Sequence, residues 1–249
     1  DGHVLGGDKI VKRALVTGGS GDIGAAICRQ LASDGYHVVV HAGQNLSRAG
    51  ELVAELTAAG ASAESVCFDV ADEVVSRKAI EQLLTDEPIQ VLVSNAGICA
   101  DAPMAGMSSE QWHSVVDVSL NGFYNVCQPL LLPMMGTRWG RVIAISSVAG
   151  QMGNRGQANY AAAKAGLQGA VMSLSREVAS RGVTANVISP GLIEGSMTDG
   201  VFDAAAIKAM VPAKRMGTPA EVAALAGFLA SDQASYITGQ VIGVNGGII

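Results

Sequence analysis

The sequence has few aromatic residues and no long apolar run. Only 4% of its 249 residues are Phe, Trp or Tyr, which disfavours a sandwich or barrel with a ring-rich core. No apolar run approaches the roughly 18 to 20 residues that span a bilayer, and the first residues lack the pattern of a signal peptide. We therefore expect a cytoplasmic protein that does not contact membranes.

Clustered cysteines and clustered positive charges are also lacking. The four cysteines form no Cys-x-x-Cys pair and have no histidine nearby at metal-ligand spacing; they are Cys28, Cys67, Cys99 and Cys127. We expect reduced, mostly buried thiols and no metal. Because the sequence has 22 acidic and 16 basic residues, a net charge of -6, nucleic acid is not an expected partner.

What the chain does have is small apolar residues in one uniform stretch. Its 49% hydrophobic content and 31 glycines suit a single domain in which helices pack closely on a sheet. Residues 1–10 are Gly-rich and lack an initiator Met, so we interpret them as a flexible end, processed or artificially added. The folded domain is expected to cover residues 11–249.

Short apolar runs alternate with Ala-rich helical stretches from residue 13 onward. This rhythm predicts an α/β fold, a single-domain, Rossmann-like, doubly wound parallel sheet of about seven strands with helices on both faces. The expected strands are residues 13–17, 36–41, 63–68, 89–94, 140–146, 183–188 and 240–244. The expected helices are residues 23–33, 46–59, 73–85, 109–135, 157–180 and 219–230. The irregular stretch 190–217, with a short helix near 203–210, follows a strand and is expected to form a substrate lid.

A glycine-rich turn lies between the first strand and the first helix. In residues 16–24, Val-Thr-Gly-Gly-Ser-Gly-Asp-Ile-Gly, the glycines permit a tight turn, and the helix N-terminus favours a pyrophosphate. The second strand ends in residues 38–44 without an Asp or Glu to hold the ribose hydroxyls of NAD. NADP(H) is therefore favoured and NAD(H) is not excluded. Arg48 is a loosely placed candidate for the 2′-phosphate, although an exposed helix cation is an equally good interpretation.

A possible acid–base group lies farther along the chain. Ser146 and Ser147 end the expected fifth strand, and Tyr160 and Lys164, four residues apart on a helix, share one face. Because the reference pKa of Tyr is about 10, Tyr160 needs a neighbouring cation to work at neutral pH. We expect Ser147 to donate to a substrate carbonyl, Tyr160 to deliver the proton and Lys164 to lower the pKa of Tyr160.

Several short motifs together resemble those of the short-chain dehydrogenase/reductase family, over almost the whole chain. They are Thr17-Gly18, Asn95-Ala96-Gly97, Ser147, Tyr160-Ala161-Ala162-Ala163-Lys164 and Pro190-Gly191. Residues 152–160 and 236–247 resemble the β-ketoacyl-acyl carrier protein reductases in particular. This resemblance implies NADPH-dependent reduction of a carrier-linked 3-oxoacyl thioester to the 3-hydroxyacyl thioester, in fatty-acid or polyketide-like biosynthesis.

The resemblance also implies roles for individual residues. Residues 95–97 would steady the sheet and line the adenosine ribose, Asp69 and Val70 would flank the adenine, Ile193 would meet the nicotinamide amide and Lys164 would bind the nicotinamide ribose. The full implied cofactor set is Gly18, Ser20, Asp22, Ile23, Gly24, Asp69, Val70, Asn95, Ala96, Gly97, Tyr160, Lys164, Pro190, Gly191 and Ile193.

Two arginines and two helices carry implied contacts with partners. Arg138 and Arg181 fall where this reductase family binds its acidic carrier protein, with two unrelated surface arginines as the alternative. The resemblance implies a homotetramer in which helices 109–135 and 157–180 pair between subunits and the C-terminus joins a second interface.

Three residues depart from the family pattern. Asp22 stands in the glycine turn, where it could cap the helix but would repel a pyrophosphate. Ser119 aligns with the family's catalytic Asn, since Asn121 faces elsewhere, and its hydroxyl is expected to hold a relay water. Gly195 replaces a nicotinamide-contacting Thr, with Ser196 or Thr198 as stand-ins.

Two other functions stay open at this point. The same site could act on a free ketone, a sugar or polyol, or a quinone, and the chain could be a non-catalytic nucleotide-binding subunit. The sequence does not define an acyl pocket, because four candidates are best interpreted as packing residues. They are Met104, Met152, Met197 and Phe202.

Overall fold

The computed structural model describes residues 11–200 and 203–249, so the predicted flexible end at residues 1–10 lies outside the described residues. Its strands are β1 (Arg13–Val16), β2 (His37–Ala42), β3 (Ala63–Cys67), β4 (Ile89–Ser94), β5 (Gly140–Ile145), β6 (Val183–Pro190) and β7 (Val241–Val244). Its α-helices are α1 (Asp22–Ser33), α2 (Leu46–Ala58), α3 (Glu73–Leu83), α4 (Ser109–Val116), α5 (Gly122–Thr137), α6 (Ala149–Met152), α7 (Ala158–Val178), α8 (Ala204–Met210) and α9 (Pro219–Ala230).

The strands form one parallel sheet in the order β3-β2-β1-β4-β5-β6-β7. The order reverses direction between β1 and β4, which is the switch point where open α/β sheets bind ligands. All strands end at the same edge, called here the carboxyl edge. The predicted doubly wound fold is therefore confirmed.

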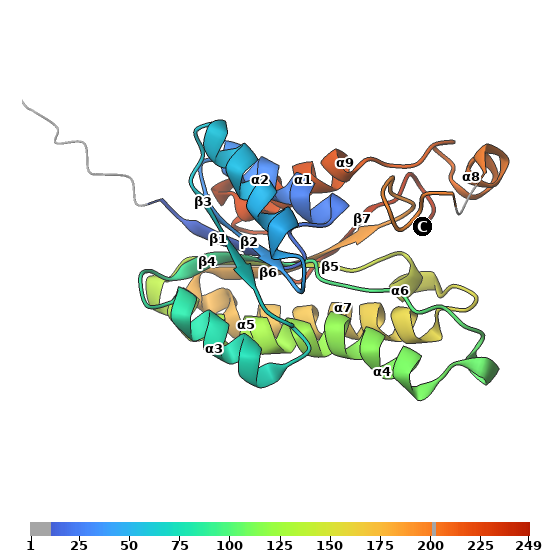
Figure 1. The fold of residues 1–249 in the computed structure, drawn as a ribbon, viewed down its shortest axis with the longest axis horizontal. Helices are drawn as coiled ribbons and strands as arrows, with labels where there is room; N and C mark the ends of the chain where they lie inside the picture. The colour runs from blue at the N-terminus through green and yellow to red at the C-terminus, as the bar shows by residue number, and fades with distance from the viewer. Residues whose placement is uncertain (1–10, 201–202) are drawn as a thin grey trace, which may run out of the picture.

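Helices cover both faces of the sheet (Figure 1). On one face Leu31 of α1 and Leu229 of α9 are fully buried, and on the other Leu130 of α5 and Leu167 of α7 are at most 1% exposed. Each buried leucine contributes roughly 1.5–3 kcal/mol of transfer free energy. Since the central strands are buried on both faces, they are continuous apolar runs rather than alternating ones.

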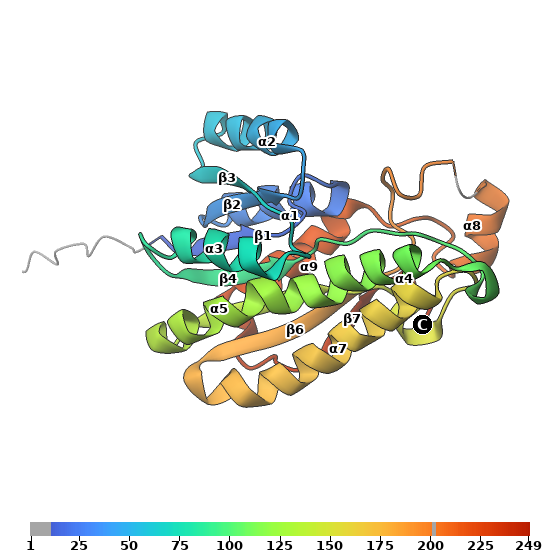
Figure 2. The same ribbon diagram turned by 60° about the horizontal axis from the view of Figure 1, so that its bottom comes forward.

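The predicted helix 109–135 is two helices. A π-helical turn at Asp117–Asn121 separates α4 from α5, which run on nearly in line beside α7 (Figure 2). Hydrophobic periodicity does not reveal such a turn, because it adds a single residue to one helical turn. The four-residue helix α6 was not predicted either. The ends of the other predicted elements agree with the structure to within two residues.

Two predictions about burial are partly or wholly wrong. Cys28 and Cys127 are buried, but Cys67 and Cys99 are exposed. The three described methionines interpreted as packing residues are also exposed, by 59–66%; they are Met104, Met152 and Met197. Phe202 lies outside the described residues.

Among the described residues, no helix combines the length and apolarity needed to cross a membrane.

Candidate active site

The glycine-rich turn after β1 is held in a conformation that only glycine allows at two positions. Gly18 has φ +61°, and a Cβ at Gly24 would collide with the carbonyl oxygen of Gly18. The side-chain amide of Asn95 donates to the carbonyls of Thr17 (3.1 Å) and Gly18 (3.0 Å). Asn95 thus joins the ends of β1 and β4 at the switch point, as the prediction that it steadies the sheet requires.

His41 is a second support of this turn, and sequence reasoning missed it. Its Nδ1 accepts the backbone N–H of Gly18 at 3.1 Å, so its Nε2–H donates to the Phe68 carbonyl at 2.9 Å. Burial lowers the pKa of His41 to about 4, so the ring is neutral at pH 7. Its position at the end of β2, beside the turn, was the available signal.

The predicted adenine-flanking segment follows β3. Asp69 is exposed and Val70 is buried. The buried amide of Asn125 on α5 donates to the Val70 carbonyl at 2.9 Å, and a Cβ on Gly122 would approach Val70 to 2.9 Å. The segment is therefore fixed from α5 by residues that carried no sequence signal.

Tyr160 and Lys164 lie on one face of α7, as predicted. The Lys164 Nζ atom is 5.6 Å from the centre of the Tyr160 ring and donates to the Ile145 carbonyl at 2.8 Å. Burial lowers the pKa of Lys164 to about 8. The expectation that Lys164 lowers the pKa of Tyr160 is wrong for the resting site: burial raises that pKa to about 12, the nearby Cys99 adds to the rise, and a hydrogen bond with Ser147 opposes it. At pH 7 the phenol is therefore protonated and the amine is mostly charged.

The structure distinguishes the two serines that follow β5. Ser146 is buried, donates to the Lys164 carbonyl at 2.9 Å and accepts from Gln168 at 2.9 Å. It fastens the strand to α7. Ser147 is only partly buried and its hydroxyl hydrogen bonds with Tyr160. Of the two, Ser147 alone has the placement predicted for a carbonyl-binding group.

Asn159 fixes the start of α7 and was not singled out from the sequence. Its side chain is fully buried, its amide donates to the carbonyls of Ala100 (3.0 Å) and Gln111 (2.8 Å), and its oxygen accepts the Tyr160 N–H (2.8 Å). These bonds tie Tyr160 to α4 and to the loop after β4. The phenol is thereby positioned from three elements.

Ser119 lies within the π-helical turn and points at the same region. It is 2% exposed, and its Oγ has no hydrogen-bond partner among the described residues. A Cβ on Gly97 would lie 3.5 Å from this oxygen and 3.3 Å from the Lys164 Nζ. Both groups therefore border the space left by the missing side chain of Gly97. Asn121 is exposed and donates to Asp117 at 2.7 Å, so it faces elsewhere, as expected.

The segment after β6 carries the remaining predicted cofactor residues. The carbonyl of Pro190 accepts from Val148 at 3.0 Å, and the Gly191 N–H donates to Val244 at 3.0 Å. Ile193 is 6% exposed and pairs with Gly217 in an isolated bridge. The base of the predicted lid is thus held on the carboxyl edge, beside the turn and α7.

Arg138 and Arg181 lie apart from this constellation. Arg138 follows α5 just before β5, and Arg181 precedes β6, so both lie where strands begin. Arg181 follows Tyr160 by 21 positions, along α7 and the short 3-10 turn Ala179–Arg181 after it, which places the two about 30 Å apart at roughly 1.5 Å per residue. Within one chain the two arginines and Tyr160 are therefore at opposite edges of the sheet.

The residues on the carboxyl edge fit a dinucleotide. There is no room for a Cβ at Gly24, in the first turn of α1, so a phosphate could approach the free backbone N–H groups of this helix N-terminus closely. The unpartnered Ser119 hydroxyl and the charged Lys164 border the adjoining space. A protonated tyrosine beside such a turn is typical of a nicotinamide-dependent oxidoreductase.

Comparison with known proteins agrees with this class. The family described as "Enoyl-(Acyl carrier protein) reductase" matches residues 19–249. The 3-oxoacyl-[acyl-carrier-protein] reductase FabG of Staphylococcus aureus (strain Mu50) is 41% identical over 96% of this chain and 99% of its own length. The FabG protein of Escherichia coli (strain K12) is 43% identical over 95% of this chain and 97% of its own. The chain belongs to the short-chain dehydrogenase/reductase family, which implies a nicotinamide cofactor.

A solved structure extends the likeness to the fold. The crystal structure of a provisionally named gluconate dehydrogenase from Agrobacterium tumefaciens superposes with a TM-score of 0.91, at 32% identity and with 95% of each chain covered. Proteins named for different substrates therefore share this fold.

Proposed function

We propose that this protein reduces a 3-oxoacyl thioester, carried by an acyl carrier protein, to the 3-hydroxyacyl thioester with NADPH. The observation that carries this proposal is the Tyr160 hydroxyl, protonated at neutral pH, hydrogen bonded with Ser147 and one helical turn from Lys164. Relatives that are 41% and 43% identical bear the name of this activity.

In the proposed reaction Ser147 donates a hydrogen bond to the keto oxygen and orients the carbonyl. The nicotinamide cofactor, when bound, supplies the hydride that adds to the keto carbon as the C=O π bond opens. Tyr160 donates its proton to the oxygen, which becomes the hydroxyl. The ammonium of Lys164 stabilises the phenolate that Tyr160 leaves behind.

Ser119 is proposed to take part in restoring that proton. Its buried hydroxyl borders the same space as the Lys164 Nζ, and a hydroxyl both accepts and donates hydrogen bonds. We assign it the role of holding a water next to Lys164. Lys164 also binds the Ile145 carbonyl, which fixes its amine for that contact.

The preference for NADPH is proposed from the end of β2. His41, the last but one residue of β2, is buried and neutral, and no acidic side chain follows it in residues 42–45. Arg48 on α2 supplies a cation near the turn. The proposed cofactor contacts are those predicted from the sequence, from Gly18 to Ile193.

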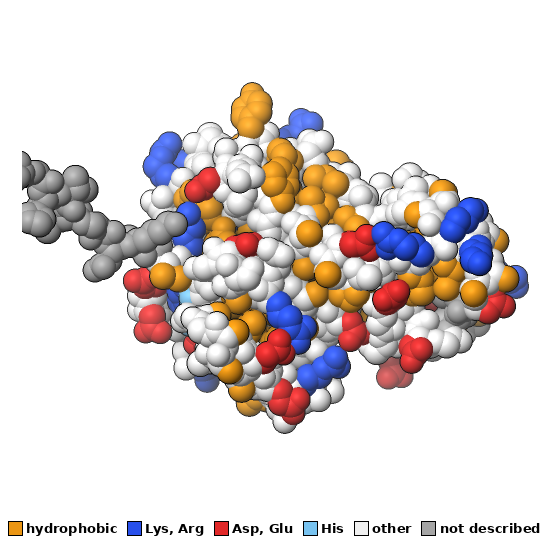
Figure 3. All heavy atoms as spheres, turned by 90° about the horizontal axis from the view of Figure 1, so that it is seen from above, with side chains coloured by type: hydrophobic (Ala, Val, Ile, Leu, Met, Phe, Trp, Pro, Cys, Tyr) orange, Lys and Arg blue, Asp and Glu red, His pale blue; other side chains and the backbone are white. Residues whose placement is uncertain are grey.

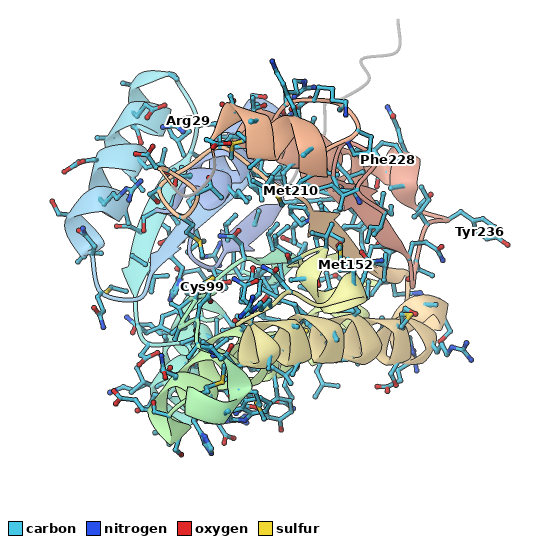
Figure 4. The ribbon with its side chains drawn as sticks, turned by 90° about the vertical axis from the view of Figure 1, so that its right-hand side faces the viewer. Arg29, Cys99, Met152, Met210, Phe228 and Tyr236 are labelled. Carbon is cyan, nitrogen blue, oxygen red and sulfur yellow. The ribbon has the colours of Figure 1, made fainter. Side chains whose placement is uncertain are left out.

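Three exposed side chains at the carboxyl edge are proposed to contact the acyl chain. Cys99, Met152 and Met210 are exposed, and Figure 4, which looks onto the carboxyl edge, shows them between α8 and α7. Residues 190–217, of which residues 201–202 lie outside the described part, are proposed to close over the substrate as a lid.

The placement of Arg138 and Arg181 constrains where the carrier protein delivers its substrate. Arg181 lies about 30 Å along α7 from Tyr160 of its own chain, and Arg138 lies beside it, since Gly182 packs against the Arg138 backbone. A carrier bound to both would therefore serve the site of a second copy. The predicted homotetramer, with its helices paired between subunits, would provide such an arrangement. The cytoplasmic location stays a prediction.

A substrate panel tests the proposed reaction against its rivals. NADPH oxidation is followed with acetoacetyl thioester, crotonyl thioester, a sugar ketone and a quinone. We expect turnover of acetoacetyl thioester at least tenfold above the others. Faster turnover of crotonyl thioester would instead support the enoyl reduction that the family description names. NADPH binding without any turnover would support the non-catalytic subunit.

A further inference from the structure

Asp22 and Gly195, two separate departures from the family pattern, touch each other in the structure. Asp22 is the first residue of α1, and Gly195 lies in the segment after β6. A Cβ on Gly195 would lie 2.7 Å from the Asp22 Oδ2 atom, so a side chain at this position would displace the carboxylate from its present place. The absence of a side chain at Gly195 therefore allows the carboxylate of Asp22 to reach the segment.

Both oxygens of the Asp22 carboxylate have partners in the structure. Its Oδ2 accepts both the backbone N–H and the hydroxyl of Ser196, each at 2.7 Å, and Arg48 approaches its Oδ1 at 3.4 Å. We call Asp22, Ser196 and Arg48 the Asp22 clasp. These hydrogen bonds lower the pKa of Asp22, so the carboxylate is charged at neutral pH. Its charge is directed to Ser196 and Arg48, which reduces the repulsion expected toward a pyrophosphate.

The clasp holds residues 194–199 at Ser196, and backbone hydrogen bonds hold the beginning of the same segment. At the base, Glu194 N–H donates to Gly217 and Gly217 N–H donates to Leu192, each at 2.9 Å. Farther along the segment, the N–H groups of Thr198 and Asp199 both donate to the Gly195 carbonyl at 3.0 Å. Figure 3 shows a notch between the body that carries α1 and the part that carries α8. The clasp joins the two sides, since it links α1 to the segment that leads to α8.

We propose that Asp22 is a positioning residue that holds residues 194–199 against the glycine-rich turn and thereby controls exchange of the cofactor. The segment follows Ile193, which is proposed to contact the nicotinamide. Asp22 is the first residue of α1, whose N-terminus is proposed to contact the pyrophosphate. A dinucleotide that enters or leaves between them requires the clasp to open. The cofactor part of this proposal rests on the proposed function, whereas the holding of the segment does not.

Hydrogen exchange of the cofactor-free protein tests the holding of the segment directly. In Asp22→Ala, the amide of Ser196 should exchange about tenfold faster or more, because its acceptor is gone. The amides of Glu194 and Gly217 should keep their protection, since their partners are unchanged. Asp34→Ala, which removes the same charge at the other end of α1, is the matched control and should change neither set. Unchanged exchange of the Ser196 amide in Asp22→Ala would overturn the proposal.

The NADPH dissociation rate, measured by stopped-flow displacement, tests the second part. Removal of a negative charge near a pyrophosphate would by itself slow dissociation, whereas loss of the clasp should speed it about five- to tenfold. The two explanations thus predict opposite signs. KM for NADPH should rise in Asp22→Ala more than kcat falls, and Asp22→Asn, which keeps an acceptor, should restore part of the difference. Slower or unchanged dissociation would contradict control of exchange.

Ser196→Ala provides a coupling test within the clasp. It removes the hydroxyl but keeps the backbone donor, so its effect on exchange should be smaller than that of Asp22→Ala. The double variant should equal Asp22→Ala, because the hydroxyl has no acceptor left. Additive effects would show that the two residues act separately and would overturn the clasp. If the wild type binds no NADPH, the proposed function fails, while the exchange experiment still decides whether the clasp exists.

Discussion

The Nζ atom of Lys164 lies 5.6 Å from the centre of the Tyr160 ring, one turn farther along the same face of α7. The two groups respond to burial in opposite directions. Burial raises the pKa of Tyr160 to about 12 and lowers the pKa of Lys164 to about 8. The pair therefore keeps a proton on the phenol and a charge on the amine at neutral pH, which suits proton donation to a substrate.

The charge on Lys164 predicts how the reduction depends on pH. Lys164 is charged below about pH 8 and loses its proton as pH rises through that value. We expect kcat/KM to be level near neutral pH and to fall above about pH 8. Lys164→Arg, whose guanidinium stays charged, should have lower activity but no such fall. An unchanged alkaline limb in Lys164→Arg would assign that limb to another group.

Ser119 and Ser146 should respond in opposite ways to replacement by alanine. The Ser119 oxygen has no partner among the described residues, so Ser119→Ala should leave the free energy of unfolding unchanged or raise it, while kcat falls about three- to thirtyfold. The Ser146 oxygen makes two buried hydrogen bonds, so Ser146→Ala should cost about 1–3 kcal/mol. Denaturant unfolding and steady-state kinetics measure both effects. A destabilised Ser119→Ala with normal kcat would remove Ser119 from the site.

His41 should make the protein less stable in mild acid. The folded ring has a pKa of about 4, below the reference value of 6.5. Between these values the unfolded chain takes up a proton that the folded chain does not, so the free energy of unfolding decreases as pH falls from about 6.5 to 4, by up to about 3 kcal/mol. The contribution is complete above about pH 6.5. Denaturant unfolding of His41→Gln should show a smaller decrease than wild type over this window, and an equal decrease would contradict the assignment.

Arg138 and Arg181, at the edge of the sheet where the strands begin, should affect only the reduction of a carrier-linked substrate. Reversing both charges, with Arg138→Glu and Arg181→Glu, should raise KM for acetoacetyl-acyl carrier protein about tenfold or more. KM for acetoacetyl-coenzyme A should stay the same, because this substrate has no acidic carrier protein for the arginines to bind. Arg77→Glu, an exposed cation on α3, is the control. Equal effects on both substrates would exclude a docking role.

The sequence predicted those parts of the molecule that depend on local pattern. The seven strands followed from apolar runs, and the shared face of Tyr160 and Lys164 followed from a spacing of four residues. The parts that could not be predicted depend on contacts across the fold. His41 and Asn159 are side chains whose partners are backbone groups of other segments, and no spacing rule indicates them. Asp22 and Gly195 are 173 positions apart, so only the fold shows that they touch.

The Tyr160 proton is the centre of this account, and one comparison tests it most directly. NADPH oxidation with acetoacetyl thioester is measured at pH 7 for wild type and Tyr160→Phe, together with NADPH affinity by fluorescence titration. The account predicts that wild type turns over, that Tyr160→Phe loses about 10²- to 10⁴-fold in kcat, and that the NADPH dissociation constant stays within about threefold. Undiminished kcat in Tyr160→Phe would show that another group supplies the proton and would contradict the central claim.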